Sequence, residues 1–350
     1  MRLWIVFLSV FLVLLAACQE KPSEEGSGPL KKDVPTTRLA ADLHTPWSIT
    51  KEGDTFYISE RSGSVAEIKD GVVTRKQLEL KEKLSTQPES GFLGFELFPD
   101  FRQSQKAYGY YTYDRDGISA NRVVVLQKQQ EKWQEQETLL DRIPSGQFHH
   151  GGRLKLGPDG CLYITTGDAL QEERAQDRGS LNGKILRVDL AGGIPAGNPF
   201  PHSSIYSYGH RNPQGLAWDG QGNLYSSEHG SAAHDEINII QAGKNYGWPL
   251  ISGSEQSPGL QRPIIHSGEE TWAPAGVAYH QGFLYIASLR GESVKQYEIR
   301  TGKWKDAVKG KGRIRDVYIE GNTLYFITNN TDGRGTPAPG DDGLFSLDIQ

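Results

Sequence analysis

The sequence Pro158-Asp159-Gly160-Cys161-Leu162-Tyr163-Ile164 decides the fold, because it joins a tight-turn signal to a short β-like run and recurs along the chain. Each copy has a polar turn, then an apolar residue, a tyrosine and a run typical of a strand. The six tyrosines are Tyr57, Tyr108, Tyr163, Tyr225, Tyr285 and Tyr325, of which Tyr108 alone lacks a clear turn before it. Self-similarity at a period of about 50 residues indicates stacked or radially arranged units.

Every unit carries strands, and none carries a convincing amphipathic helix. We therefore predict an all-β fold, a six-bladed β-propeller over residues 34–350, with about four strands in each blade. A β-sandwich with coincidental turns is the alternative, but it explains neither the number of copies nor their spacing. The 41 glycines and 18 prolines among 350 residues agree with many short strands joined by tight turns.

Charge and composition exclude several other classes of protein. The formal net charge is −5, so nothing indicates the basic surface that a nucleic-acid partner requires. Charged residues make up 23% of the chain and aromatic residues 10%, which suits a folded domain with a sizeable core. These values exclude a disordered chain, a coiled coil and a multispanning membrane protein.

The N-terminus carries the only membrane-like run of the sequence. Residues 3–17 are apolar but too short to span a bilayer, which predicts a signal peptide over residues 1–17. Leu15-Ala16-Ala17-Cys18 resembles a bacterial lipobox, so we expect Cys18 to carry lipid and residues 18–33 to form a flexible tether. The alternative is an ordinary signal peptide with an incidental cysteine. We predict an extracytoplasmic protein held at the membrane by its lipid alone, with Cys161 as a buried structural thiol.

The repeat also predicts where side chains converge. Five residues after each tyrosine that follows a clear turn lie Ser62, Asp168, Gly230, Arg290 and Asn330. If the tyrosines mark equivalent strands, these positions share one rim of the propeller, where strands end and loops begin. Antiparallel turns bring further residues back to this rim. His149 would lie beside Asp168, Arg211 beside Gly230, and Arg313 and Arg315 beside Asn330.

The arginines of this predicted rim are Arg211, Arg290, Arg313 and Arg315. A single arginine is most simply a surface ion pair. Four arginines around the opening of one channel, in a chain that is acidic overall, indicate a polyanionic ligand. The planar guanidinium group can donate two parallel hydrogen bonds to a carboxylate or a phosphate. His149 beside Asp168 is the arrangement that orients an imidazole for general-base catalysis. The rim therefore predicts an anion site next to a general base.

A second cluster combines carboxylates with glycine and asparagine. It consists of Glu228-His229-Gly230-Ser231 and Asp235-Glu236-Ile237-Asn238. Carboxylate and exposed carbonyl oxygens suit Ca²⁺, which takes six to eight hard oxygen ligands. A solvated acidic loop is the alternative interpretation.

Taken together, these motifs resemble the soluble glucose/aldose sugar dehydrogenase family, which depends on pyrroloquinoline quinone (PQQ) and folds as a six-bladed propeller. The resemblance runs from Thr45-Pro46-Trp47 almost to the C-terminus. The motifs that carry it are 91–95 (GFLGF), 98–101 (FPDF), 149–154 (HHGGRL), 157–160 (GPDG), 182–187 (NGKILR), 209–216 (GHRNPQGL), 235–238 (DEIN), 243–249 (GKNYGWP) and 313–317 (RIRDV).

The resemblance implies oxidation of the anomeric hydroxyl of an aldose to the lactone, with hydride transfer to PQQ. It implies that His149 is the general base and that Asp168 holds it. The residues expected to contact the cofactor are Arg211, Asn212, Arg290, Arg313 and Arg315. Electrons would then pass to a respiratory acceptor.

The family also implies calcium and a substrate contact. A catalytic Ca²⁺ that polarises the quinone would bind backbone carbonyls at Gly230 and Ser231, and a structural Ca²⁺ would use Glu236 and the segment at Tyr246. Glu89 would lie beside the substrate. The chain departs from the family pattern where Arg290 replaces lysine, Ser231 replaces proline and Glu89 replaces the glutamine of some members.

Two other functions stay open for a six-bladed propeller. One is a Ca²⁺-dependent lactone hydrolase, which needs a metal-bound water held by side-chain carboxylates at the channel centre and has no use for four rim arginines. The other is a non-catalytic propeller that binds a partner or a glycan.

Overall fold

The computed structural model describes Met1 and residues 35–349. Apart from Met1, the predicted signal peptide, lipidated Cys18 and tether lie outside the described residues. Within residues 35–349, no helix has the length and apolar character needed to cross a bilayer.

Within the same range, twenty-four strands form six four-stranded antiparallel blades, which confirms the predicted all-β propeller. The first two blades are β2 (Pro46–Glu52), β3 (Thr55–Glu60), β4 (Ser64–Lys69) and β5 (Val72–Glu79), then β6 (Phe92–Leu97), β7 (Lys106–Arg115), β8 (Ile118–Lys128) and β9 (Lys132–Pro144). The third and fourth are β10 (Leu154–Leu156), β11 (Leu162–Thr166), β12 (Lys184–Val188) and β13 (Ile205–Tyr208), then β14 (Pro213–Trp218), β15 (Leu224–Glu228), β16 (Glu236–Ile240) and β17 (Ile265–His266). The fifth is β18 (Pro274–His280), β19 (Phe283–Ser288), β20 (Ser293–Glu298) and β21 (Trp304–Lys309).

Two short helices, α1 (Phe101–Ser104) and the 3₁₀ helix η1 (Glu172–Ala175), lie in connecting loops.

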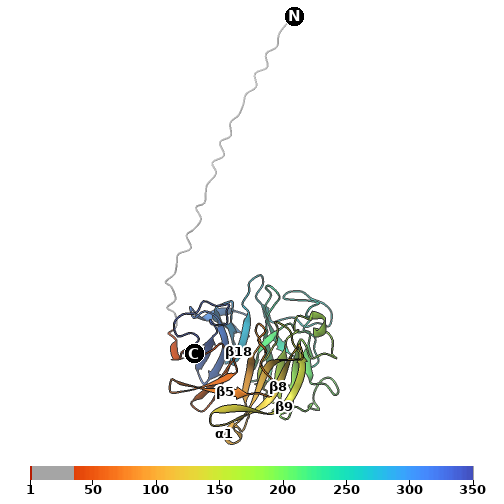
Figure 1. Ribbon diagram of the computed structural model, residues 1–350. Coiled ribbons are helices and arrows are strands. Elements are labelled where there is room, and N and C mark those ends of the chain that lie inside the picture. The colour runs from red at the N-terminus through yellow and green to blue at the C-terminus, as the bar shows by residue number, and fades with distance from the viewer. Residues whose placement is uncertain (2–34, 350) are drawn as a thin grey trace. The chain divides into compact units, whose positions relative to one another are not determined.

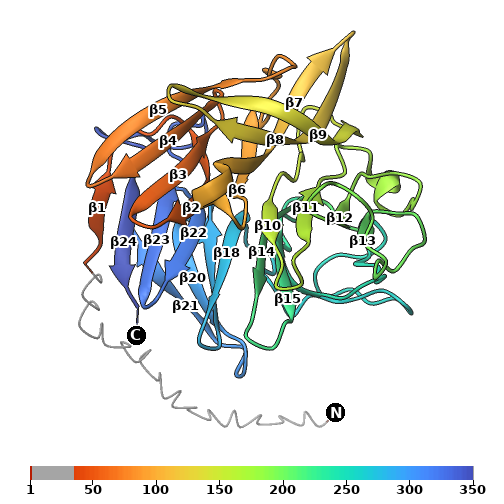
Figure 2. The ribbon, with the colours of Figure 1, turned by 90° about the horizontal axis from the view of Figure 1, so that it is seen from below.

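The sixth blade closes the ring. It combines β22 (Ile314–Glu320), β23 (Thr323–Thr328) and β24 (Leu344–Asp348) with β1 (Thr37–Ala40) from the other end of the described chain. The first strand pairs antiparallel with β24, with Thr37 opposite Ser346. This pairing covers the outer edge of the last blade, and Figures 1 and 2 show the blades following one another around a common centre. The first two blades are also joined edge to edge, because β5 pairs in parallel with β9.

All six repeat tyrosines lie in the second strand of their blades, as the sequence predicts. These strands are β3, β7, β11, β15, β19 and β23. The positions predicted to share a rim each follow the end of such a strand by two residues, from Ser62 after β3 to Asn330 after β23. Because the second strands run in the same direction, the loops that follow them gather at one face of the ring.

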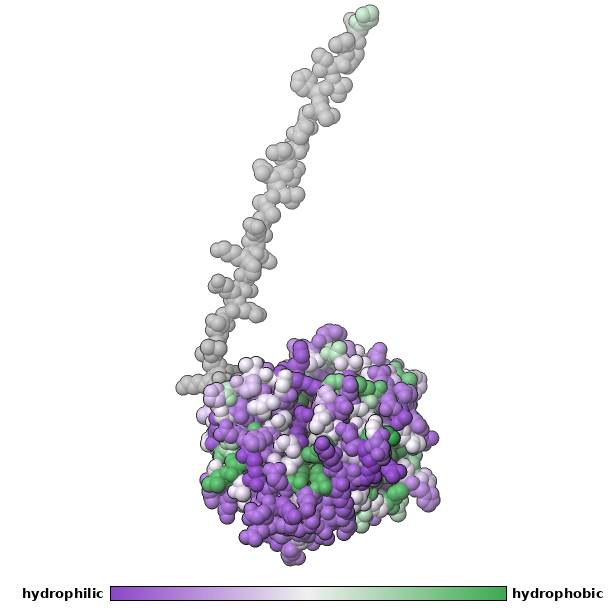
Figure 3. Space-filling model, in the orientation of Figure 1, coloured by the Kyte–Doolittle hydropathy of each residue, from purple (hydrophilic) through white to green (hydrophobic). Residues whose placement is uncertain are grey.

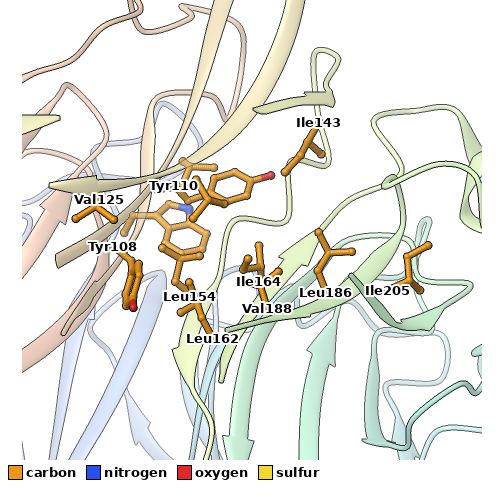
Figure 4. Close-up of a cluster of buried hydrophobic side chains, with 13 residues drawn as sticks. Tyr108, Tyr110, Val125, Ile143, Leu154, Leu162, Ile164, Leu186, Val188 and Ile205 are labelled. Atoms are coloured by element: carbon orange, nitrogen blue, oxygen red, sulfur yellow. The ribbon is translucent and has the colours of Figure 1, made fainter. Parts of the chain in front are cut away.

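The core consists of apolar side chains packed between neighbouring blades. Figure 4 shows one such cluster, in which Tyr108 and Tyr110 of β7 lie near Leu154 of β10, while Ile164 and Leu186 come from the next strands of the third blade. Sheet faces packed against each other in this way exclude water from the interior. Cys161 is a free, buried thiol, as predicted. One face of the outer surface is mostly hydrophilic, with hydrophobic side chains in small groups (Figure 3).

A buried ion pair joins four blades at the centre of the ring. Arg153 Nη1 lies 2.8 Å from Asp316 Oδ2, and both side chains are less than a tenth exposed. The same carboxylate oxygen accepts a hydrogen bond from the backbone N–H of Ile49 at 2.8 Å, and Arg153 Nε donates to the carbonyl oxygen of Gln214 at 2.8 Å. The pair therefore links β22 to β2, β14 and the start of the third blade.

Candidate active site

His149 and Asp168 form a hydrogen-bonded pair. His149 Nδ1 lies 2.7 Å from Asp168 Oδ1, and Asp168 is fully buried while the His149 side chain is 12% exposed. The second oxygen, Oδ2, accepts a hydrogen bond from Trp248 Nε1 at 2.8 Å, and Oδ1 also accepts from the Leu170 backbone N–H at 2.9 Å. The contacts from Trp248 and Leu170 hold the Asp168 carboxylate in place, and the carboxylate orients the His149 imidazole with Nδ1 toward it. Nε2 is then the ring nitrogen that can contact a substrate.

The loops approach each other closely to make this pair. His149 lies between β9 and β10 with a left-handed backbone (φ 62°), and Asp168 follows β11 by two residues. A side chain at Gly167 would collide with the carbonyl oxygen of His149, so only glycine lets the two loops meet here.

An arginine-rich cavity of about 490 Å³ lies beside this pair: His149 and Asp168 do not line it, but Glu89, which contacts the His149 backbone, and the following residues His150 and Gly151 do. Its charged lining residues are Arg61, Arg290, Arg313, Arg315, Arg334, Glu89 and Asp332. Five guanidinium groups against two carboxylates leave an excess of three positive charges. Such an excess in a cavity of drug size is suited to a small polyanion.

Two of the predicted arginines are buried in this cavity. Arg313 Nη2 pairs with Asp332 Oδ2 at 3.0 Å, but its Nε has no hydrogen-bond partner among the described residues. Arg315 Nη1 donates to Gln214 Oε1 at 2.9 Å, and burial lowers the pKa of Arg315 to about 9. A bound anion would offset this desolvation and satisfy the free donor. Arg290 also lines the cavity and is exposed.

Arg211 lines a neighbouring, smaller cavity and not the one that the other three arginines line, and it lies beside Gly230 as predicted. Its Nη1 donates to the carbonyl oxygen of Gly230 at 2.6 Å, and its guanidinium lies 5.3 Å from the centre of the Trp248 ring. Local acceptors direct the side chain into a neighbouring, smaller cavity. Asn212 is buried, and its Oδ1 accepts a hydrogen bond from the Gly151 backbone N–H at 3.0 Å, so it supports the loop that carries His149.

Glu89 lies beside the His149–Asp168 pair. Its Oε2 accepts a hydrogen bond from the backbone N–H of His149 at 3.4 Å, and its Oε1 pairs with Arg334 Nη1 at 2.5 Å. Burial alone would raise the pKa of Glu89, but the Arg334 guanidinium outweighs it and lowers that pKa to about 2. Glu89 is therefore a carboxylate at any working pH, and it can only accept hydrogen bonds.

The smaller cavity, of about 20 Å³, is large enough for a water molecule or a single ion. Glu228, Gly230, Glu236 and Tyr246 are among the residues that line it. Burial, and next the Glu228 carboxylate, raise the pKa of Glu236 to about 8, so a cation there would be favourable. The Tyr246 hydroxyl donates to the Ile239 carbonyl oxygen at 2.6 Å.

The calcium sites predicted from the sequence are only partly assembled. Gly230 lines the smaller cavity, whereas Ser231 is exposed and does not. No three or more His, Cys, Asp or Glu side chains within residues 35–349 are grouped to hold a metal ion. A metal here would therefore depend on backbone carbonyl oxygens as well as carboxylates.

Two residues of the site, Arg61 and Arg334, were missed by the sequence analysis, and a third, His229, was noted only as part of the predicted calcium cluster. Arg61 immediately precedes the predicted rim position Ser62, so a search that included the neighbours of each rim position would have found it. Arg334 lies in the loop between β23 and β24, four residues beyond the predicted rim position Asn330. His229 lines both cavities, its Nε2 has no partner among the described residues, and burial lowers its pKa to about 4.

The chain resembles sugar dehydrogenases over most of its length. The family model described as glucose / sorbosone dehydrogenase matches residues 43–336. The chain is 31% identical over 340 residues to the aldose sugar dehydrogenase YliI of Escherichia coli, covering 84% of this chain and 90% of that one. The match to quinoprotein glucose dehydrogenase B of Acinetobacter calcoaceticus is 35% identical over 201 residues, 49% of this chain and 42% of that one. A solved structure, the PQQ-bound form of aldose sugar dehydrogenase from Streptomyces coelicolor, superposes with a TM-score of 0.85 at 34% identity, covering 90% and 97% of the two chains.

Proposed function

The chain belongs to the glucose/sorbosone dehydrogenase family, and we propose that it oxidises the anomeric hydroxyl of aldose sugars to the lactone with PQQ as cofactor. The observation that carries this proposal is the cavity beside His149, with its excess of three positive charges. PQQ is a tricarboxylate, so its charge matches this excess. The PQQ-bound relative supports the same cofactor.

The residues present fit this cofactor. Arg313 has a buried Nε without a partner in the described part of the chain, and Arg315 is a charged group whose burial is costly without an anion, so both would bind the carboxylates. Bound PQQ would supply the acceptor for the two electrons and the hydrogen that leave the sugar as hydride. His149 Nε2 would take the proton of the anomeric hydroxyl, while Asp168 accepts the Nδ1 hydrogen bond and stabilises the imidazolium.

We propose Ca²⁺ as a second cofactor. The support is the ion-sized cavity between the Glu228 and Glu236 carboxylates, where a cation would relieve the raised pKa of Glu236. Glu236 and the segment at Tyr246 would hold a structural Ca²⁺ there. The carbonyl oxygens of Gly230, which accepts from Arg211, and of Ser231 are the candidate ligands of a separate, catalytic Ca²⁺. When bound near the quinone, calcium would act as a Lewis acid.

Reconstitution tests the function. Purified cofactor-free protein should reduce a redox dye with aldoses only after PQQ and Ca²⁺ are both added. Failure to oxidise any aldose at saturating cofactor would refute the proposal. Hydrolysis of sugar lactones without PQQ would instead favour the lactone hydrolase. That enzyme needs carboxylates at the channel centre to hold a metal-bound water, and Asp316 there is already paired with Arg153.

Replacing Arg313 with methionine should weaken PQQ binding by about 30-fold or more, because it removes one partner of a buried charge pair and leaves Asp332 unpaired. The measurement is an absorbance titration of the calcium-loaded protein with PQQ. Arg102→Met is the matched control, since the Arg102 side chain is 79% exposed and pairs with Glu52 away from the cavity. Equal PQQ affinity in the two variants would argue against a role for Arg313 in holding the cofactor.

We also propose that lipid on Cys18 anchors the protein outside the cytoplasm, where a respiratory acceptor would reoxidise the cofactor. The lipobox-like sequence 15–18 supports this location. Cys18→Ala should move the protein from the membrane fraction to the soluble fraction in the native host. Unchanged membrane association would exclude the anchor.

A further inference from the structure

One ion pair of the cavity lies beside His149 and adds no net charge to the lining. Arg334 Nη1 pairs with Glu89 Oε1 at 2.5 Å and links the loop between β23 and β24 to the loop between β5 and β6. The Arg334 side chain is 46% exposed and the Glu89 side chain 23% exposed, so the pair can meet solutes. Both residues line the cavity.

The pair lies directly against the general base. Glu89 Oε2 accepts from the His149 backbone N–H at 3.4 Å, and the Arg334 guanidinium lies 5.7 Å from the ring centre of Phe148, the preceding residue. On the other side, Asp332 holds the Arg334 backbone N–H at 2.9 Å through Oδ1 and Arg313 through Oδ2. A sugar brought to His149 therefore comes within reach of both charges.

The charge balance of the cavity assigns Glu89 a specific effect. A bound tricarboxylate compensates an excess of three positive charges, and this excess already includes both Arg334 and Glu89. Without the negative charge of Glu89, Arg334 would be an uncompensated cation beside the loop that carries His149. Only its Nη1 donates to a side chain among the described residues, so its other donors could bind a substrate carboxylate.

Resting on the proposed function, we propose that Glu89 masks Arg334 and so restricts the site to uncharged aldoses. Without this mask, Arg334 is a receptor for sugars that carry a carboxylate, such as uronic acids. The Glu89–Arg334 pair, and not the arginines that bind the cofactor, then determines whether the enzyme accepts neutral or negatively charged sugars.

The test compares kcat/KM for glucuronate and for glucose in enzyme loaded with PQQ and Ca²⁺. Glu89→Gln should raise the glucuronate-to-glucose ratio by about tenfold, because a unit charge becomes uncompensated within a few ångströms of the substrate. The gain should shrink as salt is added. Arg334→Met leaves Glu89 unpaired and should lower the ratio by about tenfold. The double variant should return close to the wild-type ratio.

Two controls keep the outcome specific. The PQQ affinity of each variant is measured by absorbance titration, and all kcat/KM values are compared at saturating PQQ, which separates substrate selection from cofactor loss. Glu52→Gln unmasks the exposed Arg102 far from the cavity and should leave the ratio unchanged. An active wild type whose ratio is unaffected by Glu89→Gln and Arg334→Met overturns this inference alone. A wild type inactive with every aldose overturns the proposed function and this inference with it.

Discussion

Replacing His149 with glutamine is expected to lower kcat for aldose oxidation by about a thousandfold, the usual contribution of a well-placed general base. Glutamine keeps a polar side chain of similar size but cannot take the proton of the anomeric hydroxyl. The affinity for PQQ should change little, because the cavity arginines and not His149 carry the positive charge. Steady-state dye reduction and a PQQ titration on the same preparation measure both effects.

His202→Gln is the matched control, because His202 is exposed in the loop between β12 and β13. It should retain wild-type kcat. If the His149 variant keeps more than about a tenth of the wild-type kcat, another group takes the proton, and the role assigned to the His149–Asp168 pair is wrong.

Replacing Asp316 with alanine is expected to reduce the free energy of unfolding by about 3–5 kcal/mol. The substitution leaves the buried Arg153 guanidinium without its partner, and Arg153 Nη2 already lacks a hydrogen bond among the described residues. It also removes the acceptor of the Ile49 backbone N–H and so breaks the link between blades. Urea unfolding followed by tryptophan fluorescence gives the value.

Glu320→Ala is the control for this change, because Glu320 is 53% exposed and pairs with Lys51 on the surface. Exposed pairs contribute about 0–1 kcal/mol, so this variant should unfold close to wild type. If Asp316→Ala is no less stable than Glu320→Ala, the central ion pair does not hold the ring together.

The architecture could be predicted from the sequence because it depends on local signals. Each blade repeats a turn followed by an apolar residue and tyrosine, and even the weak copy at Tyr108 lies in the second strand of its blade. The closure of β1 on β24 carries no such signal, since it joins strands from opposite ends of the propeller.

The candidate site was predictable only where strand register controls it. His149 meets Asp168 because an antiparallel turn returns one to the other. Arg211 differs, because the position of its Cα follows from the repeat but the direction of its guanidinium depends on the Gly230 carbonyl and the Trp248 ring. Arg334 lies four residues beyond the rim position Asn330, where the repeat does not predict the path of the loop, so only the structure reveals its pairing with Glu89.

The most direct test of the charge match between cavity and cofactor is a titration of calcium-loaded wild-type protein with PQQ and, separately, with its trimethyl ester, which has the same rings but no carboxylate charges. We expect PQQ to saturate at one molecule per chain and the ester to bind at least about 100-fold more weakly, because three charge-assisted contacts are lost. Equal affinity for the two compounds, or no binding of PQQ, would contradict the account.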